Sequence, residues 1–515
     1  MNSALGEWAS KVDAPVVSPA TSDGVSSDKR LALEPSVSAA VGGHLPGITA
    51  STPRTRQERL SAAFTIACAG FALISDGYQN NVMTLLNVVY KRIYPTVYTS
   101  SVSTRVSNSL LVGAILGQVI VGVVCDRVGR KAAIIGATLC IVIGAALSTA
   151  AHGANGSAEG LFWFLTFSRG LTGIGVGAEY PASSTSAAEA ANESMLSQRG
   201  PIFILVTNLP LSFGGPLAVS IFLIVYSCTS ILETLWRVIF GIGILFPLVV
   251  FYFRLKMLHS KLYRTSAIKR RVPYMLSLKR YWRRLIGTAG CWFLYDFVTF
   301  PNGVFSSTII ASVVKDASLK RTAEWQLLLG SLALPGVFLG AYLCNKLGRK
   351  YTMILGFSGY LIFGLIIGCS FDRIIKIVPL FVIFYGLLQS SGNAGPGDML
   401  GLVSSELYPT PIRGTAYGKS SLSACIGKTG AAVGTQVFTP IQNHWGKRWT
   451  FIVAAIVGIL GVLNAYIFLP NVGGEDLAKE DEAFAEYLAA NGWTGEVGED
   501  DGKNLIGAKE EVVRA

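Results

Sequence analysis

Charged residues are scarce in this sequence. They make up 14% of its 515 residues, whereas a soluble globular protein usually contains about 25%. The apolar types (AVILMFWYC) make up 51%. This balance argues against a large soluble protein and excludes a chain that is disordered throughout. The eight cysteines are dispersed along the chain, which argues against a disulfide framework.

The sequence also lacks the residue sets on which enzymes depend. Its four histidines lie outside the apolar stretches, and it has no nucleophile–base set, metal-ligand spacing or Walker motif. The string Gly173-x-Gly-x-Gly177 is similar to a nucleotide-binding loop, but no strand–turn–helix pattern surrounds it. Close helix packing is the use that we expect for these glycines. We therefore predict that the protein is not an enzyme and holds no metal or cofactor.

What the sequence does contain is a series of twelve apolar stretches, each near the roughly 20 residues needed to cross a bilayer. Because lipid cannot satisfy the open edge of a strand, helices are the spanning form that we expect. The sequence thus predicts an all-α integral membrane protein with twelve transmembrane helices in the lipid bilayer. The stretches are 61–86, 107–125, 132–151, 160–184, 201–227, 235–253, 285–314, 325–344, 351–371, 377–401, 414–440 and 449–470.

The basic residues indicate how the chain is oriented. Lys and Arg exceed Asp and Glu by 12, but they flank the apolar stretches, which favours a topological role over nucleic-acid binding. Twelve spans place both termini on one side, where loops and flanks hold 22 basic residues against about 10 on the other. We expect both termini to be cytoplasmic and the membrane to be the plasma membrane. The sequon at Asn155 then lies in an outer loop and predicts glycosylation.

Two features recur at matching places in the chain. The segment Asp126–Lys131 is echoed 219 residues later by Asn345–Lys350, and Glu189–Arg199 is echoed by Glu406–Arg413, with the two glutamates 217 residues apart. Two recurrences at nearly one offset indicate duplication of a six-helix unit. We expect a disordered tail, a first bundle, a basic linker, a second bundle and an acidic tail, at 1–58, 59–253, 254–284, 285–470 and 471–515.

The string Gly122-x-x-x-Asp126-Arg127-x-Gly129-Arg130-Lys131 resembles the loop motif of the major facilitator superfamily. The resemblance implies the major facilitator fold, with two six-helix halves and an inner gate that breaks when the transporter opens inward. In the second copy Asn345 occupies the position of the usual acid, which implies a weaker latch in the C-terminal half. The gate residues that the resemblance implies are Asp126, Arg127, Arg130, Lys131, Glu189, Arg199, Glu406 and Arg413.

Three further strings resemble the phosphate:proton symporter family: Gly177-Ala-Glu-Tyr-Pro181, Trp292-Phe-Leu-Tyr-Asp296 and Gly427-Lys428-Thr-Gly-Ala-Ala-Val-Gly434. Within that family, Ser75–Asn81 and Trp292–Pro301 are most similar to the fungal glycerophosphodiester permeases, which carry glycerophosphoinositol or glycerophosphocholine. The resemblance implies secondary active, proton-coupled transport of a phosphorylated small organic molecule by alternating access.

Ionisable residues at membrane depth are energetically costly and usually functional. Asp76 and Glu179 are the carboxylates that we expect to carry protons, and the resemblance supports this role for Asp76. Glu179 occupies a position where the symporters usually have Asp. A helix-interface role for Asp76 remains open, as does a packing or loop-pairing role for Arg169.

Trp292, Asp296 and Phe300 are spaced i, i+4, i+8 and therefore share one face of a helix. A packing stripe is the alternative, but the acid in the middle favours a face that lines a cavity. The resemblance implies that Trp292 and Asp296 line the substrate site and that Tyr180 touches the substrate. It also implies that Phe300 replaces a tyrosine.

Helix breaks are expected after Pro301 and at Gly395–Gly397, where exposed backbone groups can hold polar substrates. The symporters place a substrate-binding Asn where Gly397 stands, so we expect its loss to widen the cavity, with Asp398 adding an acid beside it. Lys428 provides a point positive charge that attracts a phosphate or neutralises a carboxylate. Asp398 and Lys428 complete the expected substrate site.

Two other functions stay open at this stage. One is export of a phosphorylated or cationic secondary metabolite, since alternating access works in both directions. The other is a nutrient sensor that signals without transporting. For the leading function the expected partners are the bilayer, a phosphorylated small molecule and protons.

Overall fold

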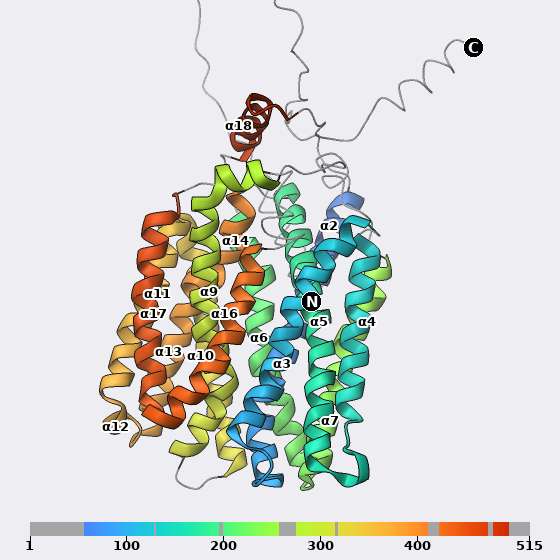
Figure 1. Ribbon diagram of the computed structural model, residues 1–515, viewed down its shortest axis with the longest axis vertical. Coiled ribbons are helices and arrows are strands. Elements are labelled where there is room, and N and C mark those ends of the chain that lie inside the picture. Colours follow the sequence, from blue (N-terminus) through green and yellow to red (C-terminus); the bar gives the residue numbers. More distant parts are fainter. Residues whose placement is uncertain are drawn as a thin grey trace, which may run out of the picture. The chain divides into compact units, whose positions relative to one another are not determined.

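The computed structural model of the chain describes residues 56–127, 130–194, 199–256, 274–314, 318–409, 422–471 and 477–493. The side chains of residues 56–69, 121–134, 180–199, 253–274, 422, 477–479, 481, 482 and 485 lie outside this description. Within the described ranges every regular element is a helix, and the long helices run alongside one another (Figure 1). The all-α prediction is confirmed.

Each of the twelve predicted stretches overlaps a helix or, for the tenth, three successive helical segments, and residues 414–421 of the eleventh lie outside the description. The long helices of the first half are α2 (Arg56–Ile93), α3 (Ser100–Arg127), α4 (Arg130–Thr149), α5 (Ala158–Ser194), α6 (Arg199–Cys228) and α7 (Leu232–Lys256). The second half has the long helices α9 (Tyr274–Val313), α10 (Leu319–Lys346), α11 (Arg349–Cys369), α16 (Leu422–Trp445) and α17 (Arg448–Phe468). Its tenth stretch is formed by α13 (Val378–Gly392), η3 (Asn393–Gly397) and α14 (Asp398–Glu406). Short elements are η1 (Ala154–Gly156) and α12 (Phe371–Ile374), and α18 (Leu477–Ala490) follows α17.

Five of the described helices are long and apolar enough to cross a membrane by length and composition alone: Gly200–Cys228, Leu232–Tyr252, Leu319–Lys346, Arg349–Cys369 and Arg448–Phe468. The other long helices carry more polar residues, and several of those polar side chains face the protein interior. Asp76 on α2 is 0% exposed and Asp296 on α9 is 2% exposed. Burial inside the bundle is where a charged residue at membrane depth is expected.

The helix packing repeats between the halves. In the first half α2 packs on α6, α3 on α5, α4 on α5 and α7, and α2 on α7. In the second half the corresponding pairs are α9 with α16, α10 with α13, α11 with α13 and α17, and α9 with α17. Between the halves α3 packs on α16, α6 on α10 and α2 on α9. Exchanging each helix for its counterpart in the other half reproduces this set of contacts, as duplication of a six-helix unit requires.

Glycines bring α3 and α5 into backbone contact. A Cβ atom added to Gly173 would collide with the backbone of Leu110, and one added to Gly177 would collide with the backbone of Ala114. Gly175 faces α4 in the same way, against Ala137. The prediction that these glycines serve close helix packing is confirmed. Small residues allow such approach in a membrane, where helix association depends on van der Waals contact.

The two expected helix breaks differ from what the structure has. α9 continues through Pro301 to Val313, so the break predicted after Pro301 is wrong. A membrane interior has no water to satisfy an open backbone, whereas a proline inside a helix frees only one carbonyl. At Asn393–Gly397 the chain does depart from α-helix, but as a π-helical turn between α13 and α14. Single π-turns of this kind occur often at functional sites.

Part of the acidic segment after Asn471 is a docked helix. The Tyr281 hydroxyl donates to Glu480 Oε1 at 2.7 Å, and Arg284 donates to Glu480 Oε2 at 3.1 Å. Phe484 and Leu488, one turn apart on α18, are each 1% exposed. Figure 1 places α18 at the end of the bundle where α9 begins. The composition of this segment indicated only an acidic tail.

The glycine packing generates a stability prediction. We expect Gly173→Val to lower the free energy of unfolding by about 1–3 kcal/mol, because the added methyl groups must push α5 away from the Leu110 backbone. Gly136→Val on α4 is the matched control, since no atom lies within 4 Å of a Cβ built there. Thermal unfolding of the purified protein in detergent measures both. Equal stability of the two variants would contradict the packing role.

Candidate functional site

A cavity of about 200 Å³ lies between the two halves. The first half contributes residues of α2, α3, α5 and α6, and the second contributes residues of α9, α10, α11, α13, η3, α14 and α16. Of the residues expected to bind substrate or carry protons, five line it: Asp76, Trp292, Asp296, Phe300 and Lys428. The stripe at i, i+4, i+8 on α9 therefore faces the cavity.

Asp296 and Lys428 form an ion pair in the cavity wall. Lys428 Nζ lies 3.3 Å from Asp296 Oδ2, with side-chain exposures of 15% and 2%. The ammonium also lies 3.9 Å from the centroid of the Phe300 ring, where the electron-rich face of an aromatic ring attracts a cation. The pair joins α9 to α16. Its lysine borders the cavity, so the arrangement is compatible with both uses that the sequence left open for Lys428.

The two carboxylates expected to carry protons lie in the first half. Asp76 lines the cavity, whereas Glu179 is 1% exposed and follows the lining residues Val176 and Gly177 on α5. The side chain of Tyr180 lies outside the described residues.

Arg169 lies outside the cavity lining and is 1% exposed. It donates to the Gln79 carbonyl at 3.1 Å. This contact ties α5 to α2, as the packing alternative requires.

Asp398 lies behind the cavity wall rather than in it. Its Oδ1 accepts a hydrogen bond of 2.5 Å from Nδ2 of Asn208, which does line the cavity. A Cβ atom on Gly340 would collide with the other carboxylate oxygen, so this glycine makes room for Asp398. The hydrogen bond joins α6 of the first half to α14 of the second.

Gly397 lines the cavity, and the widening expected from its missing side chain stays a prediction. A side chain at position 397 would meet the Tyr295 hydroxyl at 2.8 Å and the Asn208 amide nitrogen at 3.4 Å. These two cavity-lining groups therefore lie close to the backbone of Gly397. Tyr295 and Tyr360 both line the cavity, and they provide hydroxyls although Phe300 does not.

Uncharged amides dominate the polar part of the lining, and sequence reasoning missed them. Such residues do not change the net charge, so neither charge counting nor the search for ionisable groups found them. The feature of the sequence that could have identified them is an amide residue on the cavity-facing side of an otherwise apolar helix. The amides that line the cavity are Asn80, Asn81, Gln118, Asn208, Asn302, Gln326, Gln389 and Asn393.

A seam of hydrogen bonds joins the halves along one border of the cavity. Thr84 donates to the Gly303 carbonyl at 3.3 Å, and Ser307 donates to the Thr84 carbonyl. The hydroxyls of Thr104 and Thr439 lie 2.6 Å apart. These contacts hold α2 to α9 and α3 to α16. Because Thr84 and Gly303 also line the cavity, the seam has to separate before a solute can pass on this side.

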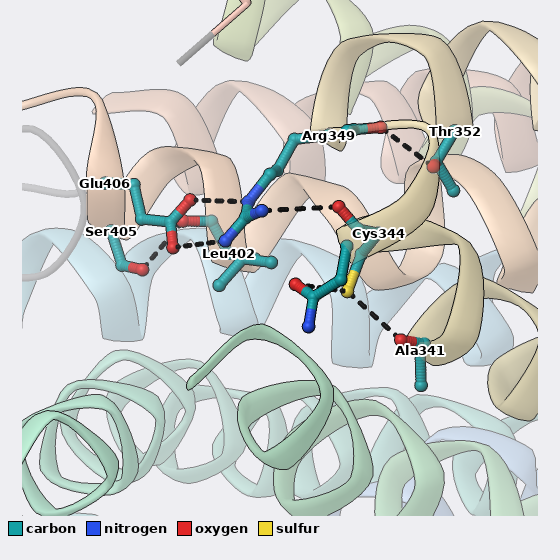
Figure 2. A network of polar contacts seen from close by, with 9 residues as sticks. Ala341, Cys344, Arg349, Thr352, Leu402, Ser405 and Glu406 are labelled. Atoms are coloured by element: carbon teal, nitrogen blue, oxygen red, sulfur yellow. Dashed lines mark hydrogen bonds and ion pairs between the residues drawn. The ribbon is translucent and has the colours of Figure 1, made fainter. Parts of the chain in front are cut away.

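At the opposite ends of the helices, Arg349 and Glu406 form a two-pronged ion pair. Arg349 Nε lies 3.1 Å from Glu406 Oε2, and Nη2 lies 3.3 Å from Oε1. Nη1 also donates to the Cys344 carbonyl at 3.3 Å. Figure 2 shows the guanidinium held between these groups. The second copies of the two repeated segments thus meet in space, at the start of α11 and the end of α14.

The remaining gate residues implied by the resemblance cannot be placed. The side chains of Asp126, Arg127, Arg130, Lys131, Glu189, Arg199 and Arg413 lie outside the described residues. Asn155 is described and sits exposed in η1 with φ of 53°. Its glycosylation stays a prediction.

Known transporters resemble this chain over most of its length. The sequence profile described as Sugar (and other) transporter matches residues 62–484. The chain belongs to the Sugar (and other) transporter family. Glycerophosphoinositol permease 1 of Candida albicans is 56% identical over 460 residues, 88% of each chain. Glycerophosphoinositol transporter 1 of Saccharomyces cerevisiae is 54% identical over 455 residues, 87% of each chain.

The fold agrees with this family. The xylose transporter XylE from E. coli matches with a TM-score of 0.66 and 15% identity, covering 80% of this chain and 99% of that one. The protein is therefore a multi-pass integral membrane transporter with the major facilitator fold, and it is not an enzyme. The superfamily suggested by the loop motif is confirmed.

The ion pair at the helix ends generates a second stability prediction. We expect Arg349→Met to destabilise the protein by about 3–5 kcal/mol, because Glu406 is 2% exposed and would lose its guanidinium partner. The double variant Arg349→Met/Glu406→Leu should recover most of that loss, since it removes both charges. Arg373→Met, at an exposed arginine on α12, is the control and should change stability little. Thermal unfolding in detergent measures all three, and a double variant as unstable as the single one would refute the pairing.

Proposed function

We propose that this transporter imports a glycerophosphodiester, with glycerophosphoinositol as the leading candidate, together with protons across the plasma membrane. Both termini are then cytoplasmic. Two fungal relatives that are more than half identical are a permease and a transporter of glycerophosphoinositol by name, which supports this substrate class.

The observation that carries the proposal is the charge of the cavity lining. Lys428 is paired with Asp296 in a lining that also contains the carboxylate of Asp76, and the other polar lining groups that the structure describes are amides, hydroxyls and the Trp292 indole. A phosphodiester carries a single negative charge at neutral pH, which one lysine can balance. Inorganic phosphate carries between one and two negative charges, so the two carboxylates of the same lining repel it more strongly than they repel a diester. We therefore expect inorganic phosphate to be a poor substrate.

In this proposal the sequence-derived residues have separate roles. Lys428 binds the phosphate, and Trp292, Asp296, Phe300 and Tyr180 border the substrate. Asp398 contributes from behind the wall through Asn208, while Asp76 and Glu179 carry the protons. Proton entry adds positive charge to a lining with two carboxylates, so it favours the anionic substrate by simple electrostatics.

Reconstituted vesicles test the function directly. The purified chain in proteoliposomes with an inward pH gradient should accumulate glycerophosphoinositol, and collapse of the gradient should abolish accumulation. Glycerophosphocholine, inorganic phosphate and glycerol 3-phosphate are compared in the same assay. Efflux of a phosphorylated or cationic metabolite without diester uptake would indicate an exporter, and binding without any flux would indicate a sensor.

Proton coupling is tested at Asp76. We expect Asp76→Asn to lower gradient-driven accumulation at least about 10-fold, because an amide cannot take up and release the proton. Exchange of substrate across the membrane without a gradient should persist. Asp372→Asn, at an exposed acid on α12, is the matched control and should behave as wild type. Normal accumulation by Asp76→Asn would show that this carboxylate has a structural role.

Phosphate binding is tested at Lys428. We expect Lys428→Met to weaken binding of glycerophosphoinositol roughly 10- to 100-fold, the range for loss of one charge-assisted hydrogen bond. Binding of myo-inositol and of glycerol, which lack the phosphate, should change little. If the lysine only neutralises Asp296, all ligands will weaken equally, and the double variant Lys428→Met/Asp296→Asn will restore expression and binding together.

A further inference from the structure

Two amides in the cavity wall have a fixed orientation. Asn208 donates through Nδ2 to the Asp398 carboxylate at 2.5 Å, and Asn393 donates through Nδ2 to the Ala333 carbonyl at 3.0 Å. A carboxylate and a backbone carbonyl are acceptors, so each amide must turn its NH₂ group toward the protein. The carbonyl oxygen of each amide is then the group left to meet a ligand.

The Asn393 oxygen is only weakly engaged by the protein. The Tyr295 hydroxyl lies 3.4 Å from it, at the long limit for a hydrogen bond between two oxygens. An amide oxygen has two lone pairs, so it can accept a shorter bond from a ligand hydroxyl.

Gln326 supplies a third acceptor. The residue lines the same cavity and is 8% exposed, and its Oε1 has no hydrogen-bond partner among the described residues. Buried polar atoms are nearly always hydrogen-bonded in native proteins. A buried amide oxygen at a ligand cavity is therefore a site at which a ligand donor is expected.

The three amides lie on adjoining elements. Gln326 and Ala333, the residue that anchors Asn393, both lie on α10 and line the cavity, and α10 packs against η3 and α6. Asn208 lies on α6. We call Asn208, Gln326 and Asn393 the acceptor wall. The ion pair of Lys428 and Asp296 belongs to other helices, α16 and α9.

We propose that the acceptor wall is the subsite for a polyhydroxylated headgroup, such as a cyclitol, whose hydroxyls donate to its amide oxygens. This inference rests on the proposed function, because it assigns one end of the phosphodiester to the acceptor wall and the phosphate to Lys428. A phosphate offers acceptors, which amide oxygens repel. A trimethylammonium headgroup has neither O–H nor N–H, so it leaves the three oxygens unpaired.

Asp398 acts in this subsite as a positioning residue. Its carboxylate is 2% exposed and holds the Asn208 amide by its NH₂ group. Asp398→Asn introduces a side chain that can itself donate, which allows the Asn208 amide to reverse and turn its NH₂ group toward the cavity. We expect this substitution to change the selectivity for the headgroup and to leave the volume of the cavity unchanged.

Direct binding of two diesters tests the acceptor wall. Isothermal titration calorimetry of the full chain in detergent measures the affinities for glycerophosphoinositol and glycerophosphocholine. These two diesters share the glycerophosphate but differ in their headgroup hydroxyls. We expect wild type to bind glycerophosphoinositol at least about 10-fold more tightly, since each hydroxyl–amide bond is worth roughly a 2- to 10-fold preference. Gln326→Met, Asn393→Ala and Asp398→Asn should each reduce that ratio several-fold, mainly by weakening glycerophosphoinositol.

Gln442→Met is the matched control, because this glutamine bonds to Thr450 and lies outside the cavity lining. Its ratio should equal that of wild type. Equal affinity of wild type for the two diesters would overturn the acceptor wall while leaving the proposed function intact, as would variants that weaken both diesters alike. If wild type binds neither diester, the proposed function fails and the subsite fails with it.

Discussion

A polar group inside a membrane protein has to find its partner within the protein, because the surrounding hydrocarbon offers none. In this transporter that requirement decides where the polar residues lie. Lys428 pairs with Asp296, and Arg169 donates to the Gln79 carbonyl. At the helix ends Arg349 pairs with Glu406. Each contact joins two helices, so the same bonds that satisfy the buried charges also hold the bundle in register.

The cavity follows from this constraint together with close helix approach. Glycines allow α3 and α5 to touch along their backbones, and the polar faces of the inner helices then meet between the two halves. Hydrogen bonds from Thr84 and Ser307 join the halves at one border of the cavity. These hydroxyl–carbonyl bonds are few and individually weak, which suits a contact that has to separate and reform during transport.

Two sets of lining residues offer a ligand different chemistry. One set presents the ammonium of Lys428 beside the Phe300 ring, and the other presents amide oxygens held in place by Asp398 and by the Ala333 carbonyl. A molecule with an anionic group at one position and hydroxyl donors at another satisfies both. An amide oxygen left without a hydrogen bond in the membrane interior has a higher free-energy cost than one in water. The amide oxygens therefore provide selectivity as well as affinity.

The sequence by itself determined the helical fold, the positions of the long helices, the superfamily and the face of α9 that lines the cavity. The helices and the lining face depend on local composition and periodicity, which a single chain displays directly, and the superfamily was indicated by the resemblance of Gly122–Lys131 to a known loop motif. The tertiary structure decided the rest. That Tyr295 and Asn208 approach Gly397, that Arg349 pairs with Glu406, and that α18 docks through Glu480 all depend on residues far apart in sequence. The continuation of α9 through Pro301 depends likewise on its surroundings, which leave the backbone no better alternative than the helix. Orientation of the Asn208 and Asn393 amides was beyond sequence reasoning for the same reason: an amide has no net charge and no preferred end until a neighbouring acceptor selects one.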